Sequence, residues 1–79
     1  MNPENPTSEQ IAQHYSAAMD SVNLINDIKA GKYDATMKPQ DKADTLERNA
    51  AHLEIMLAKD FWTNEDLKPL RDAVAAARA

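Results

Sequence analysis

Two histidines and several acidic residues are the side chains in this sequence that could bind a metal ion or transfer protons. A metal site on one helix needs ligands three or four residues apart, as in Glu-x-x-His. His14 follows Glu9 by five residues. His52 lies five residues after Glu47 and two before Glu54. Because neither spacing puts two ligands on one helix face, we expect ordinary surface histidines and no metal.

The sequence also contains no motif for nucleophilic catalysis or for phosphate binding. The chain has no cysteine, no Gly-x-Ser-x-Gly and no glycine-rich phosphate loop. Asp60, Glu65 and Asp66 cluster near Trp62, but each has a capping or solvated role available. An alanine-rich helical core also leaves little room for a substrate pocket. We therefore predict that the protein is not an enzyme and binds no cofactor.

Composition limits the remaining classes of function. The chain has 79 residues with one glycine, no cysteine and a net charge of −4. That length makes one domain, and small domains often need oligomerisation for stability. No basic stripe is present to neutralise phosphates, so we expect no nucleic-acid binding. No segment is apolar enough to span a membrane or to form a signal peptide, so a cytoplasmic protein is expected.

The first helix is expected over residues 8–30, after a flexible arm over residues 1–7 that holds two prolines. Thr7 and Gln10 have the spacing of a capping box at the start of this helix. Apolar residues then recur in steps of three and four, as in a helix packed against other helices. Gly31 follows the last turn, where a left-handed residue often ends a helix.

The second helix is expected over residues 39–60, with Pro39 in its first turn. Apolar residues recur along it in steps of three and four, which predicts one core-facing stripe. Ile55 does not belong to this stripe and lies roughly opposite, between Ala51 and Ala58 on a helical wheel. Ile55 is therefore the large apolar residue of this helix that a core within one chain does not explain.

The third helix is expected over residues 64–78, directly after a tight turn at residues 61–63. Thr63 has the position of an N-cap. Trp62 and Leu67 then have the positions of a hydrophobic staple.

Pro69 complicates the third helix because it cannot donate the hydrogen bond to the carbonyl of Glu65. The helix should either open as a short turn at residues 64–67 and restart, or be kinked. Together the three helices predict an all-α three-helix bundle, formed by a single domain over residues 8–79.

Apolar residues outside the predicted core stripes mark surfaces that are left for a partner. On the first helix, small and apolar residues cover about half of the circumference, which is wider than one packing face. Leu24 and Ile28 are either buried against the third helix or exposed to a partner. Trp62 is either a staple residue or an interface anchor, and Ile55 is either an isolated exposed residue or part of an interface. The candidate interface comprises Ala17, Leu24, Ile28, Ala51, Ile55, Ala58 and Trp62.

The most distinctive stretch runs from Asn49 to Leu67 and reads NAAHLEIMLAKDFWTNEDL. This stretch, together with Ile11 and the pair His14-Tyr15, resembles small uncharacterised proteins of marine phages, especially cyanophages. The resemblance covers about half of the chain. It implies no activity and no functional residue, but it implies a phage product that acts in the infected bacterium or in the virion.

Three hypotheses of function follow. The first is a non-enzymatic protein-interaction module, a homodimeric phage accessory factor that acts on a host or phage protein in the host cytoplasm. The second is a structural or assembly component of the virion. The third and weakest is an oligomer that sequesters a small ligand, such as a nucleotide, in a groove between subunits. The sequence does not name the protein partner.

Overall fold

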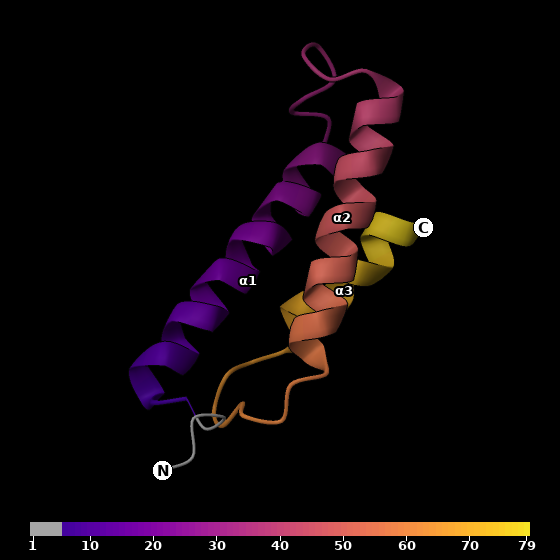
Figure 1. Cartoon of the computed structure of the whole chain (residues 1–79). Helices are drawn as coiled ribbons and strands as arrows, with labels where there is room; N and C mark the ends of the chain where they lie inside the picture. The colour runs from indigo at the N-terminus through magenta and orange to yellow at the C-terminus, as the bar shows by residue number, and fades with distance from the viewer. Residues whose placement is uncertain (1–5) are drawn as a thin grey trace.

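The computed structural model describes residues 6–79, and these residues form three mutually packed α-helices (Figure 1). The helices are α1 (Ser8–Lys29), α2 (Pro39–Leu57) and α3 (Lys68–Arg78). No strand forms within residues 6–79. The predicted all-α three-helix bundle is therefore confirmed.

α1 begins at the capping box that the sequence predicted. The backbone N–H of Gln10 donates to Thr7 Oγ1 at 3.1 Å, and the backbone N–H of Thr7 donates to Gln10 Oε1 at 2.9 Å. Two of the N–H groups that a helix start leaves unpaired thus gain partners. Residues 1–5 of the predicted flexible arm lie outside the described residues.

α1 ends in a Schellman motif at Gly31. Gly31 has a φ of 90°, and its N–H donates to the carbonyl of Ile28 at 3.1 Å, while the N–H of Lys32 donates to the carbonyl of Asp27 at 3.1 Å. A Cβ atom at Gly31 would also lie 3.0 Å from Asp34 Oδ2. Glycine is favoured here because positive φ is costly for other residues.

The core lies where the three helices meet, and each helix contributes one large side chain that is fully buried. These side chains are Ile25 of α1, Leu53 of α2 and Leu70 of α3. Ala18 and Ala73 are also buried in this cluster, which lets the helix backbones approach closely. The remaining members of the cluster are Val22 and Met56.

The predicted tight turn between the second and third helices is wrong. α2 ends at Leu57 rather than at residue 60, and α3 begins at Lys68 rather than at residue 64. Residues 58–67 form a connection that is not a regular helix and that runs below the bundle toward the start of α1 (Figure 1). Pro69 occupies the first turn of α3, where its missing N–H leaves no helical hydrogen bond unmade. α3 therefore starts at Lys68, one residue before the proline, with neither a preceding helical turn nor a kink.

Side-chain contacts explain why the connection does not become helical. Thr63 is not an N-cap, because no helix begins directly after it, and its backbone N–H donates to Glu65 Oε1 at 2.9 Å. This hydrogen bond lowers the pKa of the Glu65 carboxyl. The N-cap of α3 is Leu67, whose side chain makes no capping hydrogen bond, and Oδ1 of the preceding Asp66 accepts from the N–H of Lys68 at 3.1 Å. The predicted Trp62–Leu67 staple therefore does not form at a helix start.

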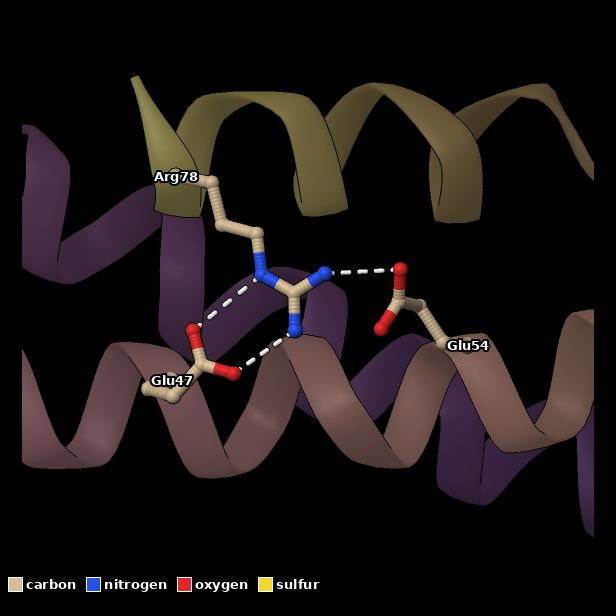
Figure 2. Close-up of polar contacts among 3 residues, drawn as sticks. All are labelled: Glu47, Glu54 and Arg78. Atoms are coloured by element: carbon tan, nitrogen blue, oxygen red, sulfur yellow. Dashed lines mark hydrogen bonds and ion pairs between the residues drawn. The ribbon is translucent and has the colours of Figure 1, made fainter.

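Arg78 joins the C-terminal end of α3 to the middle of α2 (Figure 2). Its Nε lies 3.1 Å from Glu47 Oε1, and a second guanidinium nitrogen lies 2.6 Å from Glu47 Oε2. The third nitrogen lies 2.6 Å from Glu54 Oε2. Bidentate geometry of this kind fixes orientation as well as charge. The contact holds the end of a short helix that has an alanine-rich tail.

Acidification should weaken this contact. The hydrogen bond from Arg78 holds the pKa of the Glu47 carboxyl below its usual value. A carboxyl with a depressed folded-state pKa contributes stability above its unfolded pKa and loses it as pH falls through the folded one. We expect thermal unfolding midpoints, measured from pH 7 down to about pH 3, to fall more steeply for the wild type than for Glu47→Gln.

A matched variant for this experiment is Asp20→Asn, which removes an exposed carboxylate in the middle of α1 that forms no ion pair within residues 6–79. Its midpoint should follow the wild type as pH falls. Identical pH profiles for Glu47→Gln and the wild type would show that the Arg78 contact makes no pH-dependent contribution to stability.

Candidate functional site

Ile55 is the only large hydrophobic residue within residues 6–79 that is exposed, with 59% of its surface open to solvent. Leu53, two residues earlier on α2, is fully buried. Because each residue turns a helix by about 100°, the two side chains lie on nearly opposite sides of α2. The prediction that Ile55 points away from the core is confirmed.

Ile55 lies in a row of side chains along the outer side of α2, which we call the α2 stripe. Its members recur in steps of three and four residues and so share one face of the helix. They are Asp44, Arg48, Ala51, Ile55 and Lys59. Ala51 is half-buried and the other four are exposed. Ala58, which the sequence analysis also selected, is exposed beside Ile55.

Lys59 lies just beyond the end of α2 but still follows its path. Ala58 has helical backbone angles, φ −78° and ψ −11°, and the N–H of Lys59 donates to the carbonyl of Met56 at 3.1 Å. The chain thus keeps a helical direction as far as Lys59, so this residue extends the α2 stripe at its C-terminal end.

The α1 residues of the candidate interface separate from one another in the structure. Ala17 is exposed and Leu24 is half-buried. Ile28 is only 4% exposed and lies beside Leu46 of α2 in the lining of a shallow pocket. Of the two predictions for Ile28, burial is therefore confirmed, although Ile28 lies beside α2 rather than against α3. The structure does not bring the seven predicted residues into one surface.

Trp62 is half-buried and belongs to an aromatic cluster between α1 and the connection that joins α2 to α3. Its indole N–H donates to the carbonyl of Met56 at 2.8 Å, and the same carbonyl, in the last turn of α2, also accepts from the N–H of Lys59. Its ring meets the rings of Tyr15 and Phe61 edge-on, with centroids 6.1 and 4.8 Å away. Trp62 therefore packs on the domain itself rather than standing free.

The same cluster ties the connection to α1. The hydroxyl of Tyr15 donates to the carbonyl of Asp66 at 2.7 Å. His14 stacks on Phe61 with ring centroids 5.3 Å apart. This gives His14 a packing role, and the charged groups of residues 6–79 include no set of three or more His, Asp or Glu residues arranged to hold a metal ion.

An open groove of about 450 Å³ runs between α1 and α3. Val22, Pro69 and Ala73 contribute to its apolar wall. At its rim Lys68 pairs with Asp72 at 2.6 Å, and this pairing raises the pKa of the Lys68 ammonium. Because these polar groups bind each other, the groove presents no set of side chains converging on a ligand.

The α2 stripe differs from these sites because its charged side chains make no ion pairs with the rest of the described chain. Asp44, Arg48 and Lys59 take part in none of the ion pairs formed within residues 6–79. The α2 stripe has an apolar centre and charged ends, which is the chemistry of a binding surface. Ile55 and Ala51 belong to the predicted candidate interface. Asp44, Arg48 and Lys59 do not, although their spacing of three and four residues was a signal in the sequence.

Comparisons with known protein families, with curated proteins and with solved structures found no match to this chain. Within residues 6–79, none of the helices combines the length and the apolar character needed to cross a membrane. The α2 stripe is thus defined by geometry and chemistry alone.

Proposed function

We propose that this chain is a non-enzymatic protein-interaction module that binds another polypeptide through the α2 stripe. The observation that carries the proposal is the 59% exposure of Ile55 on a helix whose opposite side supplies the fully buried Leu53. An exposed isoleucine adds nothing to the core, and it is a good centre for an interface when charged residues surround it.

The other conspicuous groups have internal roles, which supports the α2 stripe as the binding surface. Trp62 is hydrogen-bonded to the end of α2, and Arg78 is paired with two glutamates of the same helix. Asp44, Arg48 and Lys59 have no such roles within the described chain. Their charges are free to choose and orient a partner.

The resemblance to marine phage proteins supplies the setting of the proposal. In this proposal the chain is a small phage accessory factor that acts on a host or phage protein in the host cytoplasm. A structural or assembly role in the virion is the alternative. Both roles need a polypeptide-binding surface, and neither needs a catalytic group.

Capture of proteins from a lysate of the bacterial host, with and without phage infection, tests this function. We expect tagged wild-type protein to retain a partner that Ile55→Lys loses, because an ammonium group in the apolar part of the interface would be desolvated. Ser16→Lys places the same charge at an exposed position on α1 and should retain the partner.

Thermal unfolding of both variants shows whether the fold is kept. Ile55 and Ser16 are both exposed, so each midpoint should stay close to that of the wild type. Equal capture by the wild type and Ile55→Lys would exclude the α2 stripe as the binding surface. Failure of the wild type to bind any polypeptide, including itself, would exclude an interaction module.

A further inference from the structure

Opposite charges meet when the α2 stripe is paired with the same stripe of a second copy that runs in the opposite direction. The stripe begins with Asp44 and Arg48 and ends with Ile55 and Lys59, with Ala51 at its centre. When a second α2 runs antiparallel so that paired residue numbers add to 103, Asp44 meets Lys59 of the second copy at both ends. A small residue at the centre lets the helix backbones approach closely.

The same register also places Ile55 against Arg48 of the second copy. The aliphatic part of an arginine side chain can cover an isoleucine while its guanidinium group stays in water. The two-fold axis passes between Ala51 and His52, so every contact occurs twice, as a symmetric dimer requires. No charge is buried without a partner in this arrangement.

Other pairings of the same stripe put charges in conflict. In a parallel pair, Asp44 faces Asp44, and Lys59 faces Lys59. Moving the antiparallel register by four residues in one direction places Arg48 against Lys59, and in the other direction it places Asp44 against Ile55. Arg48 and Lys59 repel each other in the first of these registers. In the second, the carboxylate of Asp44 is desolvated against an apolar side chain.

We propose that the α2 stripe binds a second copy of this chain, in an antiparallel two-fold dimer with Asp44–Lys59 ion pairs at both ends. This inference rests on the proposed function, since both use the α2 stripe, and it names the partner. The residues from Asp44 to Lys59 span about 22 Å at 1.5 Å per residue. A contact between two helices of this length is small for a specific interface, so the dimer dissociates on dilution.

Sedimentation over a concentration series tests the dimer. The wild type should pass from monomer at low micromolar to dimer toward millimolar concentration. Ile55→Lys should raise the dissociation constant by about tenfold or more, because it places a lysine against Arg48 of the second copy at two symmetry-related positions. Ser16→Lys, on an exposed part of α1, should leave the dissociation constant unchanged.

Charge exchange tests the register. At low ionic strength, Asp44→Lys and Lys59→Asp should each weaken the dimer by about threefold or more, since each replaces attraction at both ends by repulsion. The double variant should restore the wild-type dissociation constant. An equimolar mixture of the two single variants should form a heterodimer. At one end the introduced lysine then meets the introduced aspartate, and at the other end the native Asp44 and Lys59 still meet.

A single cysteine gives an independent measurement, because the chain has no cysteine of its own. Ala51→Cys places a thiol beside the two-fold axis, where the close approach of the backbones suits a disulfide. It should form a covalent dimer under mild oxidation, whereas Ser16→Cys should not.

Several results would overturn the inference. A wild-type monomer at millimolar concentration would exclude the second copy, and Ile55-dependent capture of a host or phage protein would then leave the proposed function standing. A dimer that Ile55→Lys does not weaken would place self-association elsewhere. A double charge exchange that fails to restore binding, together with absent cross-linking at Ala51→Cys, would exclude the antiparallel register.

Discussion

Leu53→Ala is expected to lower the free energy of unfolding by about 2–5 kcal/mol. Leu53 is fully buried and belongs to the same core cluster as Ile25 of α1 and Leu70 of α3. Truncation loses the burial of the removed atoms and leaves a cavity that the three helices cannot fill completely. A chain of this length is stable by about 4–12 kcal/mol, so the loss is a large share of the total.

Chemical denaturation followed by circular dichroism measures this effect, and Ile55→Ala is its matched control. Ile55 lies on the same helix two residues later but is exposed, so its truncation should change stability by less than about 0.5 kcal/mol. The comparison should be made at low micromolar concentration, where the proposed dimer is dissociated. Similar losses for the two variants would contradict the assignment of the inner and outer sides of α2.

Trp62→Ala is expected to have the second-largest effect, a loss of about 2–3 kcal/mol. The indole is half-buried, meets the rings of Tyr15 and Phe61, and donates a hydrogen bond to the carbonyl of Met56. Its removal uncovers the lower end of the core and leaves the end of α2 without that partner. The cost is below that of a fully buried tryptophan because part of the ring already meets solvent.

Trp62→Phe separates the two contributions. It keeps an aromatic ring in the cluster but loses the indole N–H, so about 1 kcal/mol should be lost. Tyr15→Phe removes the hydrogen bond from Tyr15 to Asp66 and should cost a similar amount. Denaturation of all three variants by circular dichroism measures these losses. A Trp62→Phe variant as unstable as Trp62→Ala would mean that the N–H group outweighs the ring packing.

The connection between α2 and α3 shows where local sequence patterns stop being sufficient. Thr63 has the spacing of an N-cap, which predicts a helix from residue 64. The chain instead uses Thr63 and Glu65 to pair with each other, while Trp62 bonds back to Met56 and Tyr15 reaches Asp66. The contact from Tyr15 joins residues 51 positions apart in the sequence, so it cannot be predicted from patterns of neighbouring residues.

The candidate site was predictable in part. Ile55 could be found because it breaks the helical period of its own helix, which needs only the sequence around it. Ile28 could not be assigned, because a helical wheel shows which residues share a side and not which neighbour covers that side. Its burial beside Leu46 depends on how α1 and α2 pack.

Features that arise within one helix or at its ends follow from the order of residues alone. The capping box at Thr7, the Schellman motif at Gly31 and the separation of Leu53 from Ile55 each depend on residues only a few positions apart. Contacts between distant residues depend instead on how the helices pack. Arg78 meets Glu47 across 31 residues, and such a pair forms only after burial of the core has brought α3 against α2, because an exposed ion pair is too weak to position two helices.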